Sequence, residues 1–167
     1  LGLELDQAYD LFNKYHSKVP FVKELSKQVS HVASTRGYIK TLLGRKRRFE
    51  LWEPRDEWGQ KAYPLTEAYA HYPKKELKRA YTHTALNALI QGSSADITKA
   101  AMLKIWEDGY LDYIDLKLTI HDELDFSVDP LQQKCLNEAI HIMKNCVQIG
   151  VPLEVDVEKG SNWGTAK

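Results

Sequence analysis

The sequence of 167 residues predicts an α+β fold in which helices come first and an antiparallel hairpin, another helix and a strand follow. Two patterns support this prediction. Apolar side chains recur every three or four residues over residues 4–35, as on one face of a helix. Over residues 116–128 they alternate with polar side chains on both sides of His121-Asp122-Glu123, which is typical of a β-hairpin.

The first pattern predicts two helices rather than one. Pro20 lies inside residues 4–35 and cannot donate a backbone hydrogen bond, so we expect it to divide the helix. Gly37 is expected to end the second helix. A short extended stretch over residues 38–43 follows and ends at Gly44.

The middle of the chain is harder to interpret. Residues 49–75 are rich in tryptophan, tyrosine and proline and show little periodicity, which predicts a partly ordered loop or insertion. A helix is predicted over residues 75–90 and an interruption at Gln91-Gly92-Ser93. The next helix is expected to begin near Ser94 and to end at Gly109.

The segment after the hairpin predicts one helix and one strand. Apolar spacing indicates a helix over roughly residues 130–150. Residues 151–157 alternate apolar and polar side chains, which indicates a final strand before a polar tail.

Charge and composition exclude some classes of protein. The 23 basic and 23 acidic residues cancel, so the whole chain exerts no net attraction on nucleic acid, and any such site must come from local clustering. No stretch reaches the ~20 apolar residues that a membrane-spanning helix needs, and the N-terminus does not resemble a secretory signal. Cys135 and Cys146 fall too far apart along one predicted helix for a disulfide, so we expect buried thiols in a reducing compartment.

Three adjacent ionisable residues, His121-Asp122-Glu123, lie at the predicted tip of an apolar hairpin. A carboxylate held between two strands has a fixed position and offers the oxygen ligand that Mg²⁺ prefers. A charged turn that faces solvent is the simpler alternative. A His-Asp pair also occurs in HD-type metal phosphohydrolases, but those enzymes need further ligands on helices, and no suitable partners are evident here.

A second set of polar residues, His83, Asn87 and Gln91, is spaced by four and therefore predicted to share one helix face. Amide donors can reach the minor-groove acceptors that every correct base pair presents. The alternative is the polar outer face of an amphipathic helix.

The densest run of charge is Arg45-Lys46-Arg47-Arg48, directly after Gly44. Arginine binds phosphate with parallel hydrogen bonds, so Arg45 and Arg47 are candidate DNA contacts. A solvated basic surface is the alternative for this run.

Read in order, several blocks of the sequence closely resemble family A (polymerase I-like) DNA polymerases. The blocks are residues 37–47 (GYIKTLLGRKR), 86–96 (LNALIQGSSAD), 121–124 (HDEL) and 151–155 (VPLEV), with Asn162-Trp163 near the end. The resemblance covers the chain from roughly Leu5 to Trp163, apart from residues 49–75. That stretch is longer than in typical cellular members of the family, which suggests a phage-like member.

The resemblance implies roles for the residues of the predicted turn. Asp122 matches the second catalytic aspartate of the polymerase palm and a ligand of its metal pair. Glu123 matches the neighbouring, supporting carboxylate, and His121 matches the residue near the primer 3′ end.

On the helix, Asn87 and Gln91 match residues that contact the minor groove of the primer–template. His83 stands where the family more often has arginine, although histidine resembles some phage members. For Arg45 and Arg47 the resemblance implies a place in the outer fingers and no firm DNA role.

The resemblance also predicts how the chain is organised. Residues 1–75 would hold outer-fingers helices and the aromatic insertion, and residues 76–167 the C-terminal part of the palm with its antiparallel catalytic hairpin. The family's first aspartate signature is absent from this sequence. We therefore expect an inert fragment that acts with the missing N-terminal polymerase part, two Mg²⁺ ions, primer–template DNA and deoxynucleoside triphosphates, in the cytoplasm of a bacterial or phage-infected cell. A non-catalytic DNA-binding module derived from a polymerase remains the alternative.

Overall fold

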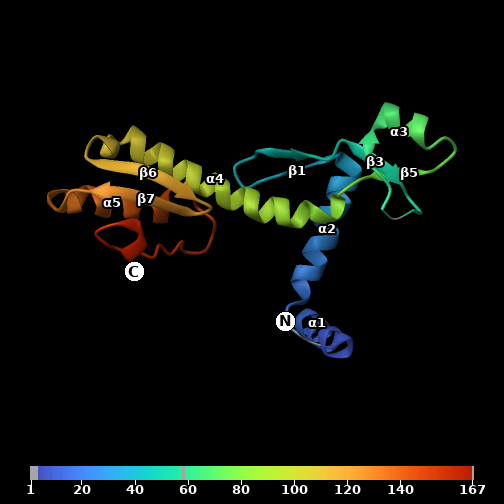
Figure 1. Cartoon of the computed structure of the whole chain (residues 1–167), viewed down its shortest axis with the longest axis horizontal. Helices are drawn as coiled ribbons and strands as arrows, with labels where there is room; N and C mark the ends of the chain where they lie inside the picture. Colours follow the sequence, from blue (N-terminus) through green and yellow to red (C-terminus); the bar gives the residue numbers. More distant parts are fainter. Residues whose placement is uncertain (1–3, 58, 167) are drawn as a thin grey trace. The chain divides into compact units, whose positions relative to one another are not determined.

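The computed structural model describes residues 4–57 and 59–166 (Figure 1). Helices and small antiparallel sheets make up the chain, which confirms the predicted α+β class. The chain divides into two compact units, Leu1–Gly92 and Ser93–Lys167. None of the helices in the described ranges is long and apolar enough to cross a membrane.

The first unit begins with the two predicted helices, α1 (Leu5–Lys18) and α2 (Pro20–Arg36). Pro20 occupies the first turn of α2, where the amide that proline lacks would have no partner in the helix. The division at Pro20 is therefore confirmed. Gly37 ends α2 with φ of 77°, a left-handed conformation that glycine adopts at little cost.

Residues 49–75 are more ordered than the sequence predicts. The strands of the first unit and one short helix are β1 (Tyr38–Lys40), β2 (Lys46–Arg48), β3 (Leu51–Pro54), β4 (Tyr63–Pro64), α3 (Leu65–His71) and β5 (Leu77–Arg79). Strand β3 lies between β4 and β5 in an antiparallel sheet. Aromatic contacts help to order it, since Tyr63 stacks on His71 at 4.1 Å and Arg79 lies 4.5 Å from the Trp52 ring. These strands are too short to show periodicity.

The predicted helix over residues 75–90 is wrong in its first half. Strand β5 occupies residues 77–79, Tyr81 has φ of 60°, and a 3₁₀ turn, η1 (Thr82–Thr84), precedes the helix. A positive φ breaks the helical path at Tyr81, so the continuous helix α4 (Ala85–Glu107) begins only afterwards.

The predicted interruption at Gln91-Gly92-Ser93 is also wrong, because α4 runs through it. Gly92 has a packing role: a Cβ at this position would lie 2.7 Å from Cγ2 of Thr41. Thr41 is buried, and glycine lets the turn after β1 approach the helix backbone closely. The core of this unit consists of Val29, Ala33, Ile39, Phe49 and Ala85.

The second unit contains the end of α4 and the predicted hairpin. Its other elements are the 3₁₀ turns η2 (Tyr110–Asp112), η3 (Pro130–Gln132) and η4 (Trp163–Thr165), strands β6 (Ile114–Ile120) and β7 (Glu123–Val128), and helix α5 (Gln133–Asn145). The hairpin and the following helix are confirmed, although α5 ends before residue 150. The core consists of Ile105, Ile114, Ala139 and Ile142.

The strand predicted over residues 151–157 is not formed, although the alternating side chains are present. A strand needs a neighbour for its backbone hydrogen bonds, and within the described parts of the chain no strand pairs with this segment. The two cysteines are free thiols, as predicted, but both are half-buried and not buried.

Candidate functional site

The β6–β7 hairpin closes through a two-residue turn made of His121 and Asp122. Ile120 pairs with Glu123 directly beneath this turn. His121 has φ of 53°, in the left-handed region that histidine tolerates better than most residues. The side chains of His121, Asp122 and Glu123 are exposed. The tight turn therefore presents the carboxylate of Asp122 at the end of the hairpin.

The strands below the turn are anchored in the core of the second unit. Ile114 is 1% exposed, and Leu124, Phe126 and Val128 pack against the same cluster. A register shift between Leu116 and Leu118 adds a bulge that increases local twist. Because one face of the hairpin is fixed by packing, Asp122 is carried on a stiff support.

Carboxylates also lie beside the turn on β7. Asp125 pairs across the hairpin with Leu118, and its Oδ2 is buried with no hydrogen-bond partner in the described residues. Asp122 and Glu123 are hard oxygen donors of the kind that suit Mg²⁺. Residues 4–57 and 59–166 hold no group of three histidine, cysteine, aspartate or glutamate side chains that could bind a metal. The turn offers ligands but not a complete metal site.

The first unit carries the amide pair predicted from the sequence. Asn87 and Gln91 are exposed on one face of α4, and Nδ2 of Asn87 donates to Oε1 of Gln91 at 3.3 Å. This bond leaves the Nε2 donors of Gln91 available to a ligand. His83 is exposed as well, but it lies on η1 rather than on the same helix.

Arg45 and Arg47, the two candidate DNA contacts of the basic run, make different contacts within the chain. Nη2 of Arg45 donates to the carbonyl oxygen of Gly92 at 2.8 Å and ties the turn to α4. The Arg47 guanidinium lies 5.5 Å from the Phe49 ring. Both arginines are exposed, but Arg45 has a structural contact that the sequence did not indicate.

Sequence reasoning also missed a cavity of about 250 Å³ in the second unit, lined by residues of α4, η2 and α5. The pKa of Lys104 is raised by its hydrogen bond to Asp108, and burial raises the pKa of the Tyr110 hydroxyl. Burial also raises the pKa of the Cys146 thiol. Each of these three shifts favours the protonated form of its group.

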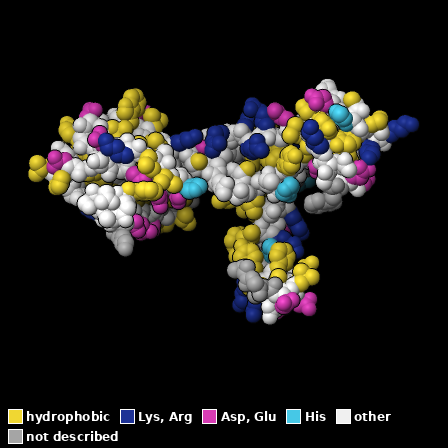
Figure 2. Space-filling view, in the orientation of Figure 1, with side chains coloured by type: hydrophobic (Ala, Val, Ile, Leu, Met, Phe, Trp, Pro, Cys, Tyr) yellow, Lys and Arg dark blue, Asp and Glu magenta, His cyan; other side chains and the backbone are white. Residues whose placement is uncertain are grey.

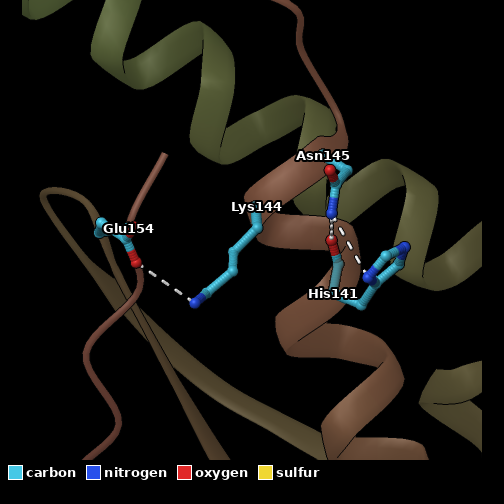
Figure 3. A network of polar contacts seen from close by, with 4 residues as sticks. All are labelled: His141, Lys144, Asn145 and Glu154. Atoms are coloured by element: carbon cyan, nitrogen blue, oxygen red, sulfur yellow. Dashed lines mark hydrogen bonds and ion pairs between the residues drawn. The ribbon is translucent and has the colours of Figure 1, made fainter. Parts of the chain in front are cut away.

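A polar network lies on α5 beside this cavity (Figure 3). Lys144 reaches Glu154 at 3.4 Å, and the Asn145 amide donates to the His141 carbonyl oxygen at 2.8 Å. The Lys144–Glu154 pair joins α5 to the segment that forms no strand. The Lys144 side chain is partly exposed and that of Glu154 is mostly exposed, so this pair contributes little to stability.

Comparison with known proteins tests the family resemblance inferred from the sequence blocks. A profile described as DNA polymerase family A matches residues 1–165. The chain belongs to DNA polymerase family A. The resemblance inferred from the sequence is confirmed.

Related family A polymerases extend well beyond this chain. The DNA-directed DNA polymerase of Pseudomonas phage M6 is 40% identical over 154 residues, which is 92% of this chain and 19% of the phage protein. DNA polymerase I of Rhizobium leguminosarum is 30% identical over 175 residues, covering 99% of this chain and 16% of that protein. The chain therefore spans less than a fifth of the length of these relatives.

A solved family A structure has the same fold. The POL domain of Pol1 from M. smegmatis, in complex with a DNA primer–template and dNTP, superposes with a TM-score of 0.74 at 29% identity. The match covers 99% of this chain and 27% of the mycobacterial chain.

Proposed function

We propose that this chain is the C-terminal portion of a DNA-directed DNA polymerase and supplies Asp122 as one of the carboxylates that bind the catalytic Mg²⁺ ions. One observation carries the proposal. In a member of family A, an exposed aspartate occupies a two-residue turn on a hairpin whose other face is fixed in a core. Such a support holds a metal ligand within the narrow geometry that Mg²⁺ requires.

The donor chemistry of the turn fits Mg²⁺, but the number of ligands does not. Asp122 and Glu123 are adjacent exposed carboxylates. The other ligands must come from the rest of the polymerase and from its substrates. Bound Mg²⁺ ions supply Lewis-acid activation of the primer 3′-hydroxyl and neutralise charge on the triphosphate. The chain alone is therefore inactive.

Asp122 contributes a fixed negative charge to this site. His121 is exposed immediately before Asp122 in the same turn. Its side chain is proposed to contact the primer end, in agreement with the role that the family resemblance implies. Glu123 pairs with Ile120 and closes the turn, so it supports the position of Asp122 as well as the local charge.

Asn87 and Gln91 are proposed to contact the minor groove of the primer–template. Their mutual hydrogen bond orients the Gln91 amide so that its Nε2 can donate to purine N3 or pyrimidine O2. These acceptors occur in every correct pair, so the contact checks pairing geometry without reading sequence. His83 on η1 is proposed to add a weaker contact.

The partners follow from this assignment. They are primer–template DNA, deoxynucleoside triphosphates and the N-terminal polymerase part, which would carry the other aspartate. The solved structure of the mycobacterial relative, in complex with a DNA primer–template and dNTP, supports the first two.

The test is primer extension by a chimeric enzyme in which this chain replaces the matching segment of the Pseudomonas phage M6 polymerase. Asp122→Asn keeps the shape of the side chain and removes its charge. We expect at least about a hundredfold lower rate, the size of loss seen when a preorganised electrostatic contact is removed. Duplex DNA binding is expected to change little.

Asp112→Asn is the matched control, because Asp112 is an exposed aspartate of the same unit in η2. It should extend primers like the parent chimera. Full extension by the Asp122→Asn chimera would reject the catalytic assignment and favour a DNA-binding module. Extension by the purified 167-residue chain would reject its inactivity.

A further inference from the structure

One face of the β1–β2 hairpin carries mostly cationic side chains. Tyr38 pairs with Arg48 and Lys40 pairs with Lys46, so these four side chains alternate with the Ile39–Arg47 pair. Ile39 is 4% exposed and belongs to the core. Since side chains alternate between faces, the face opposite Ile39 carries one tyrosine and three cations. We call these four residues the cationic face.

A ring contact confirms that these side chains share a face. Nζ of Lys46 lies 4.8 Å from the centroid of the Tyr38 ring, across the diagonal of the strand pair. Lys40, Lys46 and Arg48 are exposed, while Tyr38 is half-buried. The Tyr38 ring is thus bordered by the positive side chains of Lys40, Lys46 and Arg48.

Little negative charge offsets the cationic face. Arg48 meets Glu50 only at 3.9 Å, with both side chains mostly exposed. Among residues 4–57 and 59–166, no ion pair engages Lys40 or Lys46. Figure 2 shows Lys and Arg side chains gathered over this hairpin. The whole chain has a net charge of zero, so the local excess is a property of this surface.

The hairpin is held in a fixed orientation within its unit. The Thr41 amide donates to the Arg45 carbonyl oxygen at 2.9 Å, and Arg45 in turn bonds to Gly92 on α4. On the inner face Ile39 packs with Phe49 in the core. The cationic face is consequently preorganised, which lowers the entropy cost of binding a ligand.

We propose that the cationic face binds an unpaired nucleic-acid strand, with Lys40, Lys46 and Arg48 on successive phosphates and a base stacked at Tyr38. Lys46 and Arg48 are two apart on β2 and therefore about 7 Å apart, which suits repeating charges along an extended backbone, and Lys40 lies directly across the strand pair from Lys46. A base inside a duplex is already stacked on both faces, so the ring favours a single strand over a duplex. The biological setting, a single-stranded template ahead of synthesis, rests on the proposed function.

The test measures binding of the 167-residue chain to a fluorescent dT oligonucleotide of about 16 nucleotides. Anisotropy titrations over a range of salt concentrations are made without Mg²⁺ or nucleotides. The triple variant Lys40→Ser, Lys46→Ser, Arg48→Ser should lower the slope of log affinity against log salt by about 2, since each phosphate contact to a single strand contributes about 0.7. Tyr38→Leu should weaken binding about tenfold, whereas Tyr38→Phe should keep parent affinity.

The matched control removes three exposed lysines of the same unit, by Lys14→Ser, Lys23→Ser and Lys27→Ser. It should leave the slope near that of the parent. Circular dichroism and the urea midpoint show whether each variant is folded, and Lys46→Glu alone, expected to weaken binding further than Lys46→Ser, provides a milder second test. An equal loss of slope in both triple variants would overturn the proposal, as would an unchanged slope in the hairpin variant. Because the assay omits metal and nucleotide, its failure leaves the assignment of Asp122 untouched.

Discussion

The two-stranded hairpins of this chain, β6–β7 and β1–β2, use charge in opposite ways. The first has a two-residue turn and carries its carboxylates at that turn. The second has a longer connection, residues 41–45, and carries its cations along the strands. A short turn can project one group at a defined point, whereas a strand face repeats charge at regular intervals.

The turns also differ in what stabilises them. Residues 41–45 bond to each other and to Gly92, and Gly44 takes the positive φ of 89°. At the other turn His121, which is not glycine, takes the positive φ. One turn is thus stabilised by packing and by glycine, while the other retains local strain next to Asp122. Strained backbone in a rigid setting is common at functional sites.

The largest effect on stability is expected from closing the gap between the β1–β2 turn and α4. Gly92→Ala should lower the free energy of unfolding by roughly 1–3 kcal/mol, the usual cost of overpacking, because the new Cβ would meet buried Thr41 at 2.7 Å. Helix propensity alone predicts the opposite, a gain of about 1 kcal/mol. Urea denaturation followed by circular dichroism measures the difference.

A second substitution shows whether Thr41 is responsible. Thr41→Ser removes the methyl group but keeps the hydroxyl that donates to the Arg45 carbonyl oxygen. In the double variant most of the loss caused by Gly92→Ala should disappear. A stabilising Gly92→Ala, or no recovery in the double variant, would show that close packing is not the reason for this glycine.

The next effect concerns the strain at the acidic turn. His121→Val should destabilise the second unit by about 1–2 kcal/mol relative to His121→Gly, because a β-branched side chain is unfavourable in the left-handed region. Thermal unfolding of the two variants provides the comparison. Equal stability would mean that the turn relaxes easily and does not hold Asp122 rigidly.

The sequence predicted the acidic hairpin well because its signals are local. Alternation on both sides of His121-Asp122-Glu123 fixes strand, turn and strand without reference to other parts of the chain. Asn87 and Gln91 were placed on one helix face for the same reason, since a spacing of four is a property of the helix itself.

The errors arose where distant contacts decide the outcome. Gly92 resembled a helix break, but its partner is Thr41, far away in the sequence. Residues 151–157 alternate like a strand, yet pairing depends on a neighbour and not on the pattern. The error at His83, by contrast, is local: Tyr81 adopts a positive φ, and His83 lies on the 3₁₀ turn that follows and not on the predicted helix.

A smaller effect should separate the two arginines that the sequence treats alike. Arg45→Met removes the bond to Gly92 and should cost about 1 kcal/mol of stability, the net value of a typical hydrogen bond. Arg47→Met removes the contact of an exposed guanidinium with the Phe49 ring and should cost about 0.5 kcal/mol. Urea midpoints of both variants, combined with the dT anisotropy titration, test this order. If Arg45→Met were as stable as the parent but bound DNA poorly, Arg45 would be a phosphate ligand instead of a packing residue.

The smallest effect is expected on β7, two residues beyond Glu123. Oδ2 of Asp125 is buried without a hydrogen-bond partner in the described part of the chain, which is unfavourable for a carboxylate. Asp125→Val should therefore stabilise the second unit by up to about 1 kcal/mol, while Asp115→Val, which removes an exposed aspartate paired with Lys117 at 3.1 Å, should change little. Differential scanning calorimetry would resolve the two shifts. A loss of stability in Asp125→Val would instead mean that this carboxylate is well solvated, and that β7 tolerates negative charge along its length and not only at the turn.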